Sequence, residues 1–382
     1  MKNTDNNPLE RLPLAFISEL LADNGQLSES IYMPFREIFT NREKLREQLL
    51  ERSIIQEIAP TEEQETATTC GIDGYNSVEK LLNIDLVCCA AFAVEGLIPL
   101  SGEKRWESPC HRSLLRADRY NADINKIASA IRMQMEIELA ASSPQVLVFY
   151  DGSFITQFAG IMDNLPLALK LKESQASQEY ISRIKISIQS FETILTTRNT
   201  KKVWAGMPSN SYRNDLTAAL QWQQDYSDTI LFTILLSPGE FTAPMPVDRT
   251  ELSRVKSLPI KDEKFGAVID SLISEMNNIE FLYYRPYKWT PVLRIEIARS
   301  VSQDPSRLST LLNGIQYQCH TPGIPLPYPL YSAGKMSQSM GSVIPLLRKM
   351  FVSHITNAHK GDVDEISSLL MFKDLCIGDY NE

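Results

Sequence analysis

The stretch that most constrains the fold is Gln145–Ser153, which reads QVLVFYDGS. Its apolar run Val146–Tyr150 predicts a buried strand, and Pro144 ends the helix that we expect before it. The strand ends at Asp151, and the following Gly152 allows a tight turn or the close approach of a ligand. Functional sites in an α/β sheet assemble at the carboxyl edge of such strands.

A second Asp-Gly pair lies upstream, in Thr69–Tyr75 (TCGIDGY), which we expect to be a short strand that ends at Asp73 and Gly74. Two carboxylates from neighbouring strands would hold Mg²⁺ or Mn²⁺, which are hard cations that take oxygen ligands. Asp-Gly is also a common turn dipeptide, so either pair by itself favours a turn over a metal site.

The helix predicted over residues 119–142 adds a third carboxylate. Ile124, Ile131 and Glu138 are spaced by seven residues, so they lie within about 20° of one another on a helix. Glu138 is therefore expected on the buried face, whereas Glu136 is turned by about 200° and is expected to face water. A buried carboxylate is costly unless it is paired or bound to metal. The alternative is that Glu138 lies at a frayed helix end and reaches solvent.

The rest of the chain mixes helical and strand-like segments, which predicts an α/β or α+β domain with one central mixed sheet. The segments that we expect are a helix over 8–58, buried strand structure over 84–100, a charged connection over 101–118, helices over 155–200, a strand over 202–206, a helix over 264–280, a strand pair over 281–284 and 292–298, and helices after the proline-rich segment 322–329.

Composition restricts the class of protein. The chain has 382 residues, of which 22% are charged and 43% hydrophobic, and these values exclude a disordered or fibrous chain. No secretory signal stands at the N-terminus, and no apolar run reaches the roughly 18 residues of a membrane span. Six cysteines without a CxxC spacing indicate a reducing cytoplasm. The net charge of −9 does not attract phosphates, so binding of nucleic acid would need a local basic track or a partner.

Several short motifs, taken in order, resemble the NurA nucleases over about residues 68–350. They are Asp73-Gly, the helix that carries Glu138, Tyr150-Asp-Gly-Ser, Arg294-Ile-Glu296 and the segment Gly323–Leu330 followed by Ala333. The resemblance implies an RNase H-like mixed central sheet flanked by helices, with helical additions at both ends. We expect an N-terminal helical segment over 1–67 for dimer or partner docking, the nuclease domain over 68–350 and a C-terminal helical extension over 351–382.

The resemblance also implies an activity, a cofactor and partners. The activity is cleavage of DNA, exo or endo, with Mn²⁺ or Mg²⁺ held by Asp73, Glu138 and Asp151. Arg294 and Glu296 match a further catalytic motif. The implied assembly is a homodimer that docks on a hexameric HerA-type DNA-translocating ATPase, in DNA end processing or anti-phage defence, without a membrane.

Two positions depart from the family pattern. The family has a lysine in the turn that here reads Ala205–Asn210, and only Lys201 and Lys202, just before it, carry a positive charge. The family has a histidine soon after the position of Ala333, where this chain has Gly334 and Lys335. These departures leave open an alternative, in which the chain is a catalytically weakened RNase H-like module that serves assembly and regulation of the ATPase complex.

Candidate contacts to DNA complete the expectations. Aromatic side chains concentrate between Phe281 and Trp289 and could stack on bases, although packing of a strand pair into the core is the commoner interpretation. Arg285 and Lys288, interleaved with them, are expected to be exposed. The full set expected to contact DNA is Lys201, Lys202, Arg285, Lys288, Tyr328 and Lys335, with Tyr328 matched to a family tyrosine.

Overall fold

The computed structural model describes residues 13–57, 67–81, 84–98, 104–198, 200–208, 213–222, 226–258, 262–359 and 364. Within these ranges, ten strands form one mixed sheet in the order β1-β7-β9-β10-β6-β5-β2-β3-β4, with β8 paired to β9 beside that line. The strands are β1 (Ile55–Glu57), β2 (Thr69–Leu81), β3 (Ile84–Glu95), β4 (Cys110–Arg119), β5 (Leu147–Tyr150), β6 (Val203–Gly206), β7 (Glu240–Thr242), β8 (Met245–Pro246), β9 (Ile279–Tyr284) and β10 (Leu293–Ala298).

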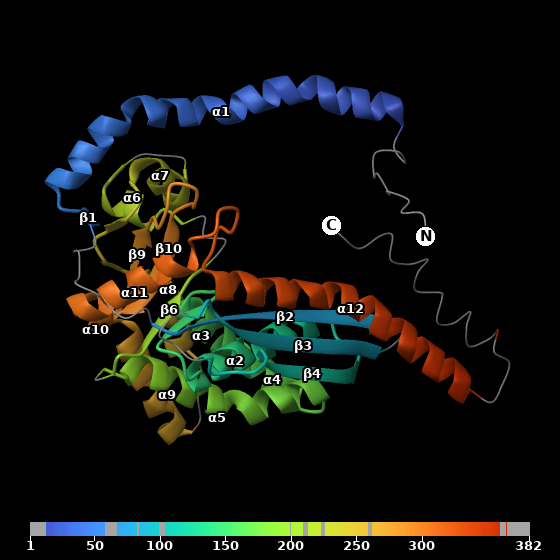
Figure 1. Cartoon of the computed structure of the whole chain (residues 1–382). Helices are drawn as coiled ribbons and strands as arrows, with labels where there is room; N and C mark the ends of the chain where they lie inside the picture. The colour runs from blue at the N-terminus through green and yellow to red at the C-terminus, as the bar shows by residue number, and fades with distance from the viewer. Residues whose placement is uncertain are drawn as a thin grey trace.

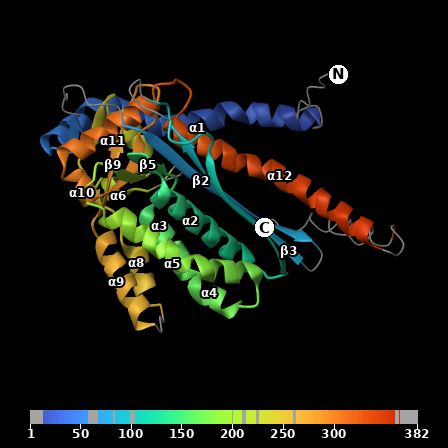
Figure 2. The ribbon, with the colours of Figure 1, turned by 60° about the horizontal axis from the view of Figure 1, so that its bottom comes forward.

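Helices cover both faces of the sheet. They are α1 (Leu14–Glu51), α2 (Ile124–Ser142), α3 (Phe154–Asp163), α4 (Leu165–Lys170), α5 (Gln175–Thr196), α6 (Asp215–Ala219), α7 (Asp228–Leu235), α8 (Thr250–Lys256), α9 (Glu263–Met276), α10 (Arg299–Ser302), α11 (Pro305–Gln318) and α12 (Tyr328–Ala358). Helices α2 and α5 lie on one side of β2 and β3, and α12 lies on the other (Figures 1 and 2). The predicted fold class, a mixed central sheet flanked by helices, is confirmed.

The two faces of the sheet bury separate apolar clusters. The cluster on the α2 face includes Ile72 and Tyr150, which pack with α2, α3 and α5. The cluster on the other face includes Phe149, which packs with α11 and with Leu330 of α12. Alternate residues of β5 therefore enter opposite cores, as the pleat of a strand buried on both faces requires. Because both faces of β5 are buried, the segment before Asp151 is apolar without interruption.

Two expectations about strands were wrong. β2 does not end at Asp73, because it continues to Leu81 as one arm of a long hairpin with β3. Asp73 and Gly74 are therefore strand residues and not a turn. The segment expected to be a charged connection contains β4, which pairs antiparallel with β3 from Cys110 to Arg119. β4 is a partly exposed edge strand that mixes charged and apolar residues, so its segment reads as polar along the sequence.

Helical segments lie towards both ends of the chain, as expected. α1 joins the sheet region at its C-terminal end, where the Arg46 guanidinium pairs with Glu240 at 2.7 Å. β1 follows α1 and adds a strand to the sheet through β7. α12 runs without interruption through residue 350, so the domain boundary that we predicted there does not coincide with the end of an element. The division into domains stays a prediction. Among the described helices, none combines the length and apolar character that crossing a membrane requires.

Candidate active site

One row of paired residues crosses four neighbouring strands in the middle of the sheet. In this row Ile72 of β2 pairs with Tyr150 of β5. Tyr150 pairs with Gly206 of β6, which pairs in turn with Glu296 of β10. β2, β5 and β6 run parallel to one another, so the residues that follow the row on these strands lie at one level of the sheet.

Asp73 and Asp151 are the next residues after this row on β2 and β5. The Asp151 N–H donates to the Ile72 carbonyl at 3.0 Å, which carries the parallel pairing one residue further. Adjacent strands are about 4.8 Å apart, so the backbones of the two aspartates are neighbours. Both residues are half-buried. The structure thus places these two aspartates on adjacent strands, as the sequence predicted.

Helix α12 holds Asp73 from one face of the sheet. The Ser337 hydroxyl, itself buried, donates to the Asp73 carboxylate. The helix approaches closely because the facing positions are small: a Cβ on Gly71 would lie 2.2 Å from the Leu330 backbone nitrogen, and one on Gly334 would lie 3.5 Å from Asp73 Oδ2. The glycines of β2 and α12 therefore permit the contact that orients this carboxylate.

A third carboxylate, that of Glu136, comes from α2 on the opposite face of the sheet. This side chain is fully buried, with Oε1 accepting from Arg132 Nη1 at 2.5 Å and Oε2 accepting from Gln157 Nε2 at 2.8 Å. Oε1 lies against Gly74, where a Cβ would be only 2.4 Å away. Burial raises the pKa of Glu136 to about 7; the negative charge of Asp73 adds to the rise and Arg132 opposes it. The expectation that Glu136 faces water was wrong.

Glu138 lies on the other side of α2. It is buried, as predicted, but its Oε2 accepts from Arg183 Nη1 of α5 at 2.9 Å and lies 3.4 Å from Arg112 Nε of β4. Burial raises its pKa, and both arginines oppose that rise. Since α2 is covered by the sheet on one side and by α5 on the other, two positions 200° apart are both buried. The expected grouping of Glu138 with Asp73 and Asp151 is therefore corrected, because Glu136 takes that side of the helix.

The predicted Arg-x-Glu motif on β10 lies inside the protein. Arg294 stacks over the Phe281 ring at 4.0 Å, and its Nη2 is 2.8 Å from Asp215 Oδ2. Glu296 accepts from Arg294 Nε at 3.4 Å, while its Oε2 is buried without a hydrogen bond. Burial raises the pKa of Glu296, and the positive charge of Arg294 opposes the rise.

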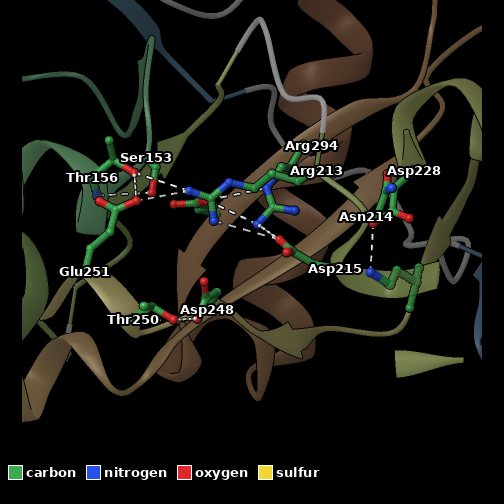
Figure 3. A network of polar contacts seen from close by, with 12 residues as sticks. Ser153, Thr156, Arg213, Asn214, Asp215, Asp228, Asp248, Thr250, Glu251 and Arg294 are labelled. Carbon is green, nitrogen blue, oxygen red and sulfur yellow. Dashed lines mark hydrogen bonds and ion pairs between the residues drawn. The ribbon is translucent and has the colours of Figure 1, made fainter. Parts of the chain in front are cut away.

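A second arginine, which sequence reasoning missed, stands at the same edge. Arg213 Nη2 lies 3.3 Å from Thr156 Oγ1 and 3.5 Å from Glu251 Oε1, and Nη1 lies 3.9 Å from Asp215 Oδ2 (Figure 3). It precedes α6 in a loop, so no periodic pattern points to it. One signal was present: Arg213 is the first positively charged residue after β6 along the chain.

Comparison with known proteins gives the family. The sequence model of the NurA domain matches residues 38–333. The chain belongs to the NurA family. No curated protein matches the chain by sequence. Among solved structures, the NurA nuclease from Sulfolobus solfataricus superposes with a TM-score of 0.56 at 14% identity, covering 90% of this chain and 98% of that one. A NurA structure with manganese superposes with a TM-score of 0.53 at 12% identity, covering 88% and 99%. At these identities the likeness demonstrates the NurA fold.

On this NurA sheet, the two predicted lysines lie far from the aspartates. Lys202 precedes β6, whereas the row of paired residues crosses β6 at Gly206, four residues or about 13 Å further along the strand. The Lys202 ammonium donates to the Ser143 carbonyl and lies 4.9 Å from the centre of the Trp204 ring, and desolvation lowers its pKa. Lys201 is exposed beside it. Their distance from the row follows from the length of β6.

The remaining candidates divide between surface and core. Arg285, expected to be exposed, is half-buried and donates to the Leu236 carbonyl at 2.6 Å, while Lys288 is exposed as predicted. Tyr328 begins α12 half-buried, and Lys335 is exposed one residue beyond the glycine that faces Asp73. The aromatic residues favour the core interpretation, since Phe281, Tyr283 and Tyr284 are buried and Trp289 alone is largely exposed, at 49%.

Proposed function

We propose that the chain is a metal-dependent deoxyribonuclease that hydrolyses phosphodiester bonds, exo, endo or both. The observation that carries the proposal is that Asp73 and Asp151 are neighbours on adjacent strands, with Glu136 of α2 packed against Gly74. Membership of the NurA family supports it. So do the solved structures of a NurA nuclease and of NurA bound to dAMP and manganese.

The cofactor in this proposal is Mn²⁺ or Mg²⁺, and its candidate ligands are Asp73, Asp151 and Glu136. Glu136 thus takes the role that the sequence assigned to Glu138. The donor chemistry fits, because all three side chains offer oxygen ligands to a hard cation. The charge pattern also fits, since Asp73 raises the pKa of a buried Glu136, and a divalent cation would relieve that repulsion. When bound, such a cation lowers the pKa of a water ligand and offsets charge on the phosphorane.

The protein's own groups hold these carboxylates in position. Ser337 orients Asp73, while Gln157 and Arg132 orient Glu136. In this proposal Arg294 and Glu296 keep the roles expected from the family motif, with Arg294 neutralising charge beside Glu296, and both side chains are buried. Electrostatic groups fixed in this way contribute more to a transition state than mobile ones, because they need no reorganisation during the reaction.

The test is degradation of linear DNA by the purified protein with Mn²⁺, with Mg²⁺ and with a chelator. Wild type is expected to degrade DNA with either metal, and Asp151→Asn is expected to lose that activity. The matched control is Asp270→Asn, which removes one carboxylate from the exposed surface of α9. Equal degradation by wild type and Asp151→Asn would refute the assignment of the site.

The partners belong to the same proposal. We propose that the enzyme works in the cytoplasm as a homodimer on a hexameric HerA-type ATPase, in DNA end processing or anti-phage defence. The net charge of −9 supports dependence on a partner, because such a surface holds DNA poorly by itself. Stimulation of DNA degradation by the purified ATPase is the expected result.

A second candidate function is a catalytically weakened module that serves assembly of the ATPase complex. Two observations favour it. Among the described residues, no three His, Cys, Asp or Glu side chains are grouped closely enough to hold a metal ion. Arg132 already neutralises Glu136 at 2.5 Å. Calorimetric titration with Mn²⁺ separates the two candidates, since absence of binding at millimolar metal with intact binding of the ATPase would favour the module.

A further inference from the structure

The two arginines at the edge of the site are held in different ways. Arg294 has 1% of its side chain exposed and is fixed by Asp215 at 2.8 Å and by stacking on Phe281. Arg213 has 30% of its side chain exposed, and its polar contacts span 3.3–3.9 Å. Good N–H···O bonds are about 2.7–3.2 Å long, so the contacts of Arg213 are weak ones. Of these two arginines, Arg213 is the one that solvent reaches and that can exchange its acidic partners for another anion.

Arg213 lies close to the proposed reaction edge. Its contact Thr156 is on the first turn of α3, which begins directly after Asp151, Gly152 and Ser153. The side chains of Ser153, Thr156 and Arg213 are gathered in one place (Figure 3). A guanidinium presents five donors in a planar fork that matches a phosphate, so Arg213 offers such a group at the first turn of the helix that follows Asp151.

The acidic partners of Arg213 would not be left unpaired if it moved to another anion. Asp215 keeps its short contact with Arg294 at 2.8 Å. Glu251 keeps the hydrogen bond from the Thr156 hydroxyl at 3.2 Å and is 26% exposed to water. Leaving a buried charge without a partner is the main cost of breaking an ion pair, and that cost is avoided here. Exchange of Glu251 for a phosphate therefore needs little rearrangement.

We infer that Arg213 binds a backbone phosphate of the DNA next to the bond that is cut, and that Glu251 holds this arginine when DNA is absent. The inference rests on the proposed nuclease function and adds a substrate-binding residue to it. It also supplies a local positive charge in a chain of net charge −9.

The first test is binding of a fluorescent single-stranded oligonucleotide, measured by anisotropy in a chelator at several salt concentrations. Arg213→Met is expected to weaken binding about tenfold and to reduce the salt dependence by about one phosphate contact. Arg213→Lys is expected to recover part of the loss, because it keeps the charge without the fork. The matched control is Arg254→Met, whose arginine on α8 is 64% exposed and pairs with Asp163 at 3.5 Å; its affinity should stay within about twofold.

The second test separates binding from a structural role. Glu251→Gln removes the competing anion, so affinity for the oligonucleotide is expected to rise about threefold. Asp163→Asn makes the same change of charge in the other ion pair and should leave the affinity unaltered. A structural role for the Arg213–Glu251 contact predicts weaker binding in Glu251→Gln, together with a lower melting temperature.

The possible results distinguish a failure of this inference from a failure of the proposed nuclease function. Wild-type binding in Arg213→Met, weaker binding in Glu251→Gln, or no binding of DNA by wild type would each overturn the inference. If wild type cleaves DNA while Arg213→Met binds normally, the nuclease proposal stands and the inference fails. If binding depends on Arg213 while no metal supports cleavage, the inference stands and the nuclease proposal fails.

Discussion

The two sides of α2 each bury one glutamate, and the surroundings of the two differ. Glu138 faces α5 and β4, where it pairs with Arg183 and Arg112, and Arg183 also pairs with Glu179 at 2.8 Å. Glu136 faces β2, where it pairs with Arg132; burial raises its pKa, and the charge of Asp73 adds to that rise. The first arrangement is a balanced ion pair, and the second concentrates negative charge that a cation could relieve. Burial alone therefore does not distinguish a structural carboxylate from a candidate ligand; the charges around it do.

The largest effect should come from replacing the glutamate on the sheet side. Glu136→Gln is expected to lower Mn²⁺-dependent DNA degradation by at least about 100-fold, because it removes the charge of a proposed metal ligand. The measurement is the initial rate on linear DNA at saturating metal. Glu138→Gln serves as the control, with an expected rate within about threefold of wild type per folded molecule. An equal loss in both variants would contradict the distinction between the two sides.

The next largest effect concerns stability on the other side of the helix. Glu138→Gln is expected to lower the free energy of unfolding by about 2 kcal/mol, because Arg183 loses a charge-assisted hydrogen bond inside the protein. Denaturant unfolding measures this change. Glu275→Gln removes a similar partner from the more exposed Arg198 and should cost less than about 1 kcal/mol. If the two variants lose equal stability, Glu138 is not the structural ion pair described here.

A smaller change tests the contact between α2 and β2. A Cβ at position 74 would lie 2.4 Å from Glu136 Oε1 and 2.9 Å from the Ala90 carbonyl, so Gly74→Ala must displace the carboxylate. We expect about a tenfold loss of nuclease rate. A factor of ten corresponds to about 1.4 kcal/mol, which lies in the lower part of the usual free-energy cost of overpacking. Gly25→Ala is the control, because nothing lies within 4 Å of that Cβ. An unchanged rate in Gly74→Ala would show that the position of Glu136 does not matter.

The smallest effect is expected from the opposite face of β2. Ser337→Ala removes the hydroxyl that donates to Asp73, at a cost of about 1 kcal/mol and about fivefold in nuclease rate. Ser339→Ala, on an exposed position of the same helix, should change neither quantity. Rates and unfolding curves on the two variants measure the difference. Unaltered activity in Ser337→Ala would mean that Asp73 needs no support from α12.

Much of the fold followed from local pattern. The apolar run before Asp151 predicted β5, the seven-residue spacing predicted α2, and the strand pair near Phe281 was confirmed as β9 and β10. β4 was missed because this edge strand mixes charged and apolar residues without a regular alternation, so its segment looks like a connection. The end of β2 was misplaced because Asp73 and Gly74 favour turns by themselves, while twelve paired positions with β3 extend the strand.

The site was predictable where it depends on neighbouring strands and unpredictable where it depends on helix packing. Two aspartates after apolar runs were enough to predict a pair at one edge. The third carboxylate was assigned to Glu138 on the assumption that α2 has one buried face. Arg213 was missed because loops have no period, so only its place after β6 pointed to it.

The sequence by itself determined that two aspartates come after apolar stretches and that a helix with two glutamates lies between them, because hydrophobic periodicity is a local property of the chain. It also supported the NurA resemblance, which the family match confirmed. Only the tertiary structure decided which glutamate packs against β2 and which arginine contacts the first turn of α3. Those choices depend on α5 covering the second face of α2 and on the pairing of β5, β6 and β10, and contacts between such distant segments leave no periodic trace in the sequence.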